Sequence, residues 1–161
     1  MAIENVREYL KPFGLDKKIM EFEVSSATVA LAAKALGTEE ARIAKTLSLE
    51  AKDGTCLLVV AAGDVKIDNH KFKEAFGFKA KMLSFDDVLI KTGHAAGGVC
   101  PFANPEGTQI FLDESLRRFE TVFPACGSAN SAIELSPETL FDISHALGFV
   151  DVCKPIVPIA E

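Results

Sequence analysis

The sequence lacks the features that would place it in a membrane or beside a common cofactor. No apolar run approaches about 18 residues, so no membrane-spanning helix is expected. The first residues, Met1–Glu8, are amphipathic and acidic and do not resemble a signal peptide. The phosphate-binding, dinucleotide-binding and His-Glu-x-x-His zinc motifs do not occur, which argues against ATP, NAD or zinc. We therefore expect a cytoplasmic protein without a cofactor.

Metal-ligand patterns are also scarce. The four cysteines lie far apart and form no Cys-x-x-Cys pair, so a structural zinc site is not expected. In a reducing compartment the thiols should be free. The acidic pairs Asp86–Asp87 and Asp113–Glu114 stand at predicted helix starts. Their charges interact favourably with the helix dipole there, so we do not expect them to bind a metal ion.

The chain carries a net charge of −6, which argues against a general nucleic-acid or DNA binder. Between Lys66 and Lys81, however, five lysines face two acidic residues. Such a stretch can meet a phosphate backbone, although a solvated helix face would show the same pattern. The lysines that we expect to contact a phosphate backbone are Lys66, Lys71, Lys73 and Lys79.

Apolar periodicity predicts helices and strands that alternate along the chain without a repeat or a linker. Helices are expected at 3–13, 29–36, 69–76, 85–91 and 137–147, and strands at 19–24, 43–50, 56–62, 78–82, 108–113, 121–124, 131–135 and 149–152. Asp53–Gly54 between two apolar runs predicts a hairpin. With 161 residues, 48% of them apolar, we expect one domain spanning residues 1–161 with an α/β (α+β) fold.

Two stretches stand out as a candidate site. Lys45 lies in Arg42–Leu49, whose alternation predicts a lysine held on a strand. The loop Thr92–Pro101 holds three glycines, which let main-chain N–H groups approach a ligand, and a proline that stiffens its exit. A fixed cation beside a glycine loop suggests a pocket for an oxygen-rich ligand. A solvent-exposed lysine and an ordinary turn would give the same pattern.

Three motifs follow one another in a characteristic order: Lys45–Leu47, the Gly97-x-x-x-Pro101 loop, and Phe123–Leu135. Together they resemble the YbaK / prolyl-tRNA synthetase-associated editing domain family over nearly the whole chain. The resemblance implies a mixed, curved sheet approaching a barrel with surrounding helices. It also implies hydrolysis of mischarged aminoacyl-tRNA, with tRNA(Pro) carrying Cys or Ala as the expected substrate. tRNA is then the expected partner, and an aminoacyl-tRNA synthetase is a further candidate.

Hydrolysis of an aminoacyl ester needs a bound carbonyl, a stabilised oxyanion and an attacking water. Main-chain N–H groups of Gly97 and Gly98 are candidate oxyanion donors. As an ammonium, Lys45 could hold the terminal phosphate or ribose of tRNA, or polarise the ester. As a base it would need burial to lower its pKa, and the sequence gives no sign of burial. The expected catalytic residues are therefore Lys45, Gly97 and Gly98.

Other residues leave alternatives open. Cys100 and His94 share the glycine loop and could form a nucleophile–base pair acting on another acyl ester, or an inert thiol beside a shaping histidine. The turn Gly127–Ser131 is expected to form a second wall, but it lacks the Gly-Gly and histidine of the family, so the amino-acid specificity stays open. A non-catalytic tRNA- or synthetase-binding module is the alternative function. The substrate-binding residues that we expect are Thr28, Thr46, His94, Cys100, Pro101, Gly127, Ser128 and Asn130.

Overall fold

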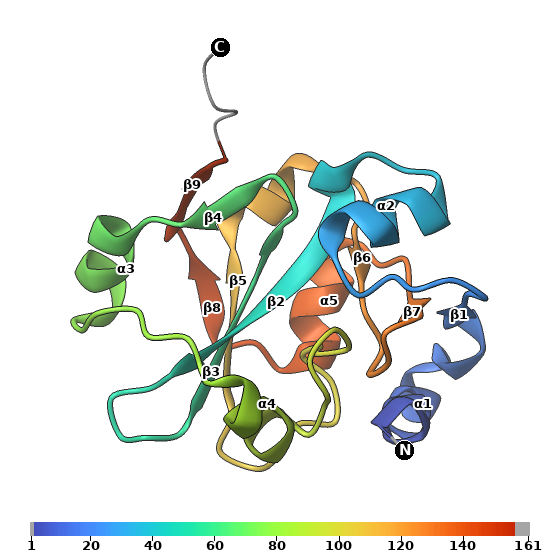
Figure 1. The fold of residues 1–161 in the computed structure, drawn as a ribbon, viewed down its shortest axis with the longest axis horizontal. Coiled ribbons are helices and arrows are strands. Elements are labelled where there is room, and N and C mark those ends of the chain that lie inside the picture. The colour runs from blue at the N-terminus through green and yellow to red at the C-terminus, as the bar shows by residue number, and fades with distance from the viewer. Residues whose placement is uncertain (1, 157–161) are drawn as a thin grey trace.

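The computed structural model describes residues 2–156, and its largest sheet has five strands in the order β6-β2-β3-β5-β8 (Figure 1). The strands are β2 (Ile43–Glu50), β3 (Cys56–Ala62), β5 (Gln109–Asp113), β6 (Phe123–Pro124) and β8 (Gly148–Val150). The β2–β3 pair is antiparallel and the other three pairings are parallel. The predicted single α/β domain with a mixed sheet is therefore confirmed.

The β2–β3 hairpin forms the centre of the sheet. Its turn depends on Gly54, which has a φ of 85°, and on Asp53, whose carboxylate accepts hydrogen bonds from Thr55. Every residue of β3 is buried, as expected for a strand with both faces covered. On one face, Phe111 of β5 packs against Phe76 of α3 (Asn69–Phe76). On the other face, a smaller apolar cluster contains Leu58 and Ile110, with Val99 of the glycine loop packed against it.

Five α-helices surround this sheet in residues 2–156: α1 (Ala2–Leu10), α2 (Val29–Leu36), α3, α4 (Phe85–Thr92) and α5 (Pro137–Ser144). In the view of Figure 1, α3 and α2 lie toward opposite ends of the molecule. Thr28, Ser84 and Ser136 cap the starts of α2, α4 and α5, each accepting a hydrogen bond from a backbone N–H of the first turn. No helix in this part of the chain is long and apolar enough to cross a membrane.

Two short sheets were only partly foreseen. β1 (Met20–Glu21) pairs with β7 (Ser131–Ala132), and both are shorter than the strands predicted at 19–24 and 131–135. β4 (Val65–Ile67) pairs with β9 (Cys153–Pro155), and neither was predicted as a separate strand. Three-residue strands that pair across a long sequence separation leave little periodicity to detect.

Three other predicted elements end or fail for local reasons. The helix predicted at 3–13 stops at Leu10, and Lys11–Phe13 form a 3₁₀ turn around Pro12. The helix predicted to reach Leu147 ends at Ser144, because His145 adopts the left-handed conformation with a φ of 57°. The strand predicted at 78–82 was wrong, since only an isolated bridge from Met82 to Leu49 forms there.

Candidate functional site

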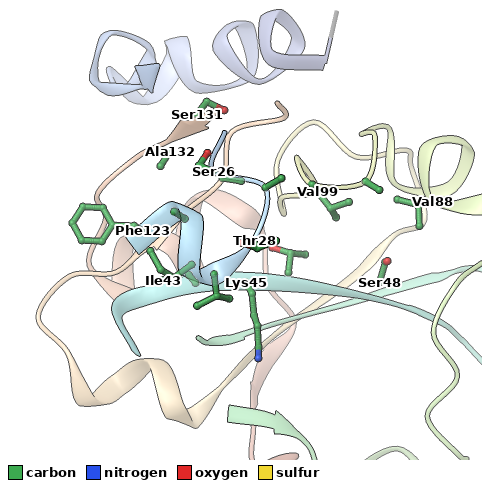
Figure 2. Close-up of a pocket in the computed structure, with 18 residues that line it drawn as sticks. Ser26, Thr28, Ile43, Lys45, Ser48, Val88, Val99, Phe123, Ser131 and Ala132 are labelled. Carbon is green, nitrogen blue, oxygen red and sulfur yellow. The ribbon is translucent and has the colours of Figure 1, made fainter. Parts of the chain in front are cut away.

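A cavity of about 370 Å³ lies beside β2 (Figure 2). This volume is at the small end of the roughly 300–1,000 Å³ seen for ligand sites. Its walls come from the start of α2, β2, the Val88 turn of α4, the glycine loop and the segment around Phe123 and Ser131. Most lining residues are alanine, serine, threonine, glycine or valine, and among residues 2–156 Lys45 is the only ionisable one that lines it. The cavity therefore suits a small, uncharged side chain of a ligand.

The glycine loop and the turn at Gly127–Ser128 meet without side chains between them. A Cβ added to Gly98 would lie 2.7 Å from the Ser128 backbone nitrogen, so only glycine fits. Gly97, with a φ of 91°, lines the cavity, and a Cβ there would lie 3.0 Å from the Cβ of Ala27. The Gly98 N–H donates to the Ala95 carbonyl at 3.0 Å and is already used inside the loop. Of the two predicted oxyanion donors, Gly97 is therefore the better placed.

Hydrogen bonds at both ends hold the loop in shape. The Thr92 hydroxyl donates to the Val88 carbonyl at 2.6 Å and accepts from the His94 N–H at 3.1 Å. The Asn104 amide donates to the carbonyls of Thr92 at 2.8 Å and Cys100 at 3.1 Å, which ties the two ends together. The loop backbone is thus ordered by its own contacts before any ligand binds.

His94 and Cys100 lie behind the loop and do not line the cavity. Both are fully buried; the His94 Nε2 lies 2.7 Å from the Phe102 carbonyl oxygen and 3.4 Å from the Cys100 Sγ. Burial raises the pKa of Cys100 to about 12 and lowers the pKa of His94, so a neutral pair is favoured. Pro101 is buried beside them. The prediction that these three residues contact a ligand is not supported, because the bond to Phe102 turns the imidazole inward.

Lys45 sits on β2, as the sequence predicted, but its charge lies away from the cavity. The ammonium donates a hydrogen bond to the Val65 carbonyl of β4. Figure 2 shows the side chain pointing toward β4, on the other side of β2 from Thr28 and Val99. The residue is half-buried, and burial lowers the pKa of Lys45. Both the direction of the side chain and its burial differ from what the sequence suggested.

The two predicted threonines line the cavity in different hydrogen-bonding states. The Thr28 hydroxyl accepts from the Leu31 N–H at 3.2 Å and so is already used as the cap of α2. The Thr46 hydroxyl oxygen is buried and has no hydrogen-bond partner within residues 2–156. Buried polar atoms are nearly always paired, so a lone hydroxyl in a cavity wall points to a ligand group that completes it.

The turn predicted as a second wall, Gly127–Ser131, holds the neighbouring segments together mainly from outside the cavity. The Ser128 hydroxyl donates to the Ser131 hydroxyl at 2.7 Å, and the Asn130 amide donates to the Phe22 carbonyl at 2.9 Å. Gly127 packs on the first turn of α1. None of Gly127, Ser128 and Asn130 lines the cavity; the neighbouring residues Ala125, Ser131 and Ala132 do so instead.

Residues 23–143 match the model of the aminoacyl-tRNA editing domain. The chain belongs to the aminoacyl-tRNA editing domain family. It is 50% identical over 154 residues to the uncharacterised protein YwhH of Bacillus subtilis (strain 168), covering 96% of this chain and 98% of that protein.

Two solved structures share the editing-domain fold. The hypothetical protein APE2540 superimposes with a TM-score of 0.83 at 31% identity, covering 93% of this chain and 99% of the other. A proposed trans-editing enzyme for prolyl-tRNA synthetase superimposes with a TM-score of 0.85 at 26% identity, covering 95% and 97%. The resemblance drawn from the sequence motifs is confirmed.

The lysines predicted to contact RNA do not line the cavity of this editing domain. Lys66 lies on β4, and Lys71 and Lys73 lie on α3, which covers the sheet face that carries Phe111. Lys71 is occupied, because its ammonium donates to Asp151 at 3.1 Å and to the Cys153 carbonyl at 3.0 Å. Lys79 is exposed on the segment between α3 and α4. These lysines therefore lie outside the cavity.

Several lining residues were not predicted. Ala44 and Ser48 flank Thr46 at two-residue spacing on β2 and line the cavity with it. The period of a strand could have predicted them once Thr46 was placed in the site. Ser26, Val88 and Phe123 come from three separate segments of the chain and carry no shared sequence signal. Only the fold brings them together.

Proposed function

We propose that this editing-domain protein is a trans-acting deacylase that hydrolyses mischarged aminoacyl-tRNA. The substrate proposed is tRNA(Pro) carrying a small wrong residue such as cysteine or alanine, handled in the cytosol where charged tRNA is used. The observation that supports it is the cavity beside β2, whose small uncharged side chains adjoin a glycine loop. Such a cavity accepts a short side chain next to main-chain donors and excludes bulky or charged ones.

The proposed reaction needs no protein nucleophile. Water attacks the ester carbonyl carbon, and the carbonyl electrons move onto its oxygen, which the Gly97 N–H would stabilise. Collapse of this intermediate breaks the bond to the terminal ribose, and the ribose oxygen leaves with the proton that the attacking water gives up. Removal of one main-chain donor of this kind typically lowers the rate by about 100- to 1000-fold.

Cys100 has no nucleophilic role in this proposal. Its thiol is fully buried, and a pKa raised to about 12 leaves almost no thiolate at neutral pH. Cys100→Ala should therefore keep deacylation near the wild-type rate, with a loss of stability of about 1 kcal/mol from the smaller side chain. A rate loss of several orders of magnitude in a folded Cys100→Ala protein would instead favour the Cys–His mechanism.

The direct test is a deacylation assay with purified protein. tRNA(Pro) charged with alanine, cysteine or proline, and a tRNA charged with a large residue, would be compared by release of the free amino acid. We expect alanine or cysteine to be released fastest and the large residue to be spared. Binding of these tRNAs without release of any amino acid would contradict the enzyme and support a non-catalytic binding module.

A further inference from the structure

The outer edge of β2 is hydrogen-bonded on both sides of a short gap. At the start of the strand, Ile43 and Ala44 pair with β6. Farther along, the Ser48 carbonyl accepts from the Leu83 N–H at 3.0 Å, and the Glu50 N–H donates to the Lys81 carbonyl at 2.8 Å. The gap between these pairings lies where β2 borders the cavity.

Thr46 occupies this gap. The N–H and C=O groups of alternate strand residues point to the same edge, so those of Thr46 share the outer edge with Ser48. Neither group has a hydrogen-bond partner at this edge within residues 2–156. The Thr46 hydroxyl oxygen is also buried without a partner. The backbone N–H, the backbone C=O and the hydroxyl of a single residue are thus left free at the cavity wall.

These free groups define the chemistry of a matching ligand. In an antiparallel sheet, the N–H and C=O of one residue pair with the C=O and N–H of one residue opposite. An aminoacyl ester carries an amino group and a carbonyl on the same α-carbon and so presents this complement. Within residues 2–156 no carboxylate lines the cavity, so carbonyl and hydroxyl oxygens are the acceptors there for an ammonium group.

We propose that the aminoacyl group fills the gap at Thr46 as a single added β-residue. Its α-ammonium donates to the Thr46 carbonyl and hydroxyl oxygens, and its ester carbonyl accepts from the Thr46 N–H. The substrate side chain then lies on the same sheet face as the Thr46 side chain, among the small residues of the cavity. This inference rests on the proposed deacylase function and adds that the site selects substrates with a free α-amino group.

The first test separates a ligand contact from a structural one. Thr46→Val keeps the shape but removes the unpaired hydroxyl, so it should raise the melting temperature while lowering kcat/KM by about 10- to 100-fold, as expected for a hydrogen bond to a charged group. Thr46→Ser keeps the hydroxyl and should lose less of kcat/KM than Thr46→Val. A Thr46→Val protein with unchanged kcat/KM would overturn the role of the hydroxyl, whatever its stability.

The second test varies the substrate. N-acetylation of the aminoacyl group removes the ammonium, so wild-type protein should cleave N-acetyl-alanyl-tRNA at least about tenfold more slowly than alanyl-tRNA. Thr46→Val should narrow this difference, because the lost hydroxyl contacts the same ammonium. Equal cleavage of both substrates by wild-type protein would overturn the inference while leaving the deacylase function intact.

A binding test covers the case in which the deacylase function fails. An alanyl group joined by an amide to the 3′ position of adenosine cannot be hydrolysed as an ester, and its binding can be followed by NMR. We expect the Thr46 amide signal to shift on titration, more than that of Thr121, which lies outside the cavity lining. A Thr46 shift without esterase activity would support the aminoacyl site and contradict the enzyme. Binding with no Thr46 shift would contradict this site.

Discussion

Lys45 and Thr46 are neighbours in the sequence motif, yet β2 turns their side chains to opposite sides. Thr46 faces the cavity with an unpaired hydroxyl, and the Lys45 ammonium bonds to the Val65 carbonyl of β4. The motif could predict that both residues matter but not which face each one takes, because the face depends on the pairing of β2 with its neighbours. The hydrogen-bond partners of Lys45 and Thr46 therefore distinguish their roles, which the residue types alone do not.

The position of Lys45 predicts an indirect effect on activity. Lys45→Ala should lower deacylation and cost about 1–3 kcal/mol of stability, because it leaves the buried Val65 carbonyl without its donor. Hydrogen exchange should become faster in β4. If activity falls while β4 exchange and stability stay at wild-type values, the ammonium acts on the substrate directly, and the conformation in Figure 2 is not the active one.

His94 predicts an acid-sensitive loop. Burial lowers the folded-state pKa below the ordinary value of 6.5, so unfolding takes up a proton between these two values. The stability contributed by neutral His94 is therefore present above about pH 6.5 and is lost as the pH falls toward the folded pKa, with a slope of at most about 1.4 kcal/mol per pH unit.

The measurement is the melting temperature between pH 7 and pH 5. His94→Gln can keep the donor to the Phe102 carbonyl but cannot take up the proton, so its melting temperature should fall less over this range. His70→Gln, at an exposed position on α3, is the control for removing an imidazole. Identical pH slopes in wild type and His94→Gln would show that His94 does not carry the effect.

At the scale of elements, the glycine loop is a rigid wall that depends on two glycines for different reasons. Gly97 needs a positive φ, whereas Gly98 needs space against the Ser128 backbone. Gly107 offers a matched comparison, since its φ of 90° resembles the 91° of Gly97 and a Cβ there would meet nothing within 4 Å.

Substitution by alanine should separate these effects. Gly107→Ala and Gly97→Ala should each cost about 1–3 kcal/mol from backbone strain, but only Gly97→Ala should also lose activity. Gly98→Ala should be the least stable of the three, because its Cβ would push the two walls apart. Melting curves and deacylation rates of all three variants give the comparison; equal activity in Gly97→Ala and Gly107→Ala would contradict a catalytic role for this part of the loop.

The elements show which parts of the fold the sequence could predict. The β2–β3 hairpin and helices α2, α3 and α4 follow from local signals: Asp53–Gly54 between apolar runs, cap residues, and glycines after each helix. β4 and β9 form only because residues about ninety positions apart pair with each other. The end of α5 was missed because His145 takes the left-handed conformation before the predicted end at Leu147.

At the scale of the whole molecule, the proposed function requires a protein of net charge −6 to accept a polyanion. The segment between α3 and α4 offers a route. It begins near the lysines of α3, carries Lys79, and then runs along the edge of β2 through the bonds of Lys81 and Leu83 to the gap at Thr46. We propose that tRNA phosphates follow this segment toward the cavity. The sequence located these lysines but not their path, which depends on how the segment pairs with β2.

The last prediction tests this path. Replacement of the exposed lysines Lys66, Lys73 and Lys79 by glutamine should raise KM for aminoacyl-tRNA and change kcat little, because phosphate contacts hold ground and transition states equally. Lys71 is left in place, because its replacement would break the bonds to Asp151 and Cys153 and so change stability as well as binding.

Salt dependence distinguishes a contact from a general loss of charge. Each lost phosphate contact should lower the slope of log K against log salt by about 0.7–0.9, so the triple variant should lose a slope of about 2–3. A control triple variant, Lys17, Lys18 and Lys52 to glutamine, changes the net charge equally at exposed positions and should keep the wild-type slope. If both variants keep it, the tRNA does not reach the α3 side, and a partner such as a synthetase must hold the tRNA while this domain supplies the cavity around Thr46 and Gly97.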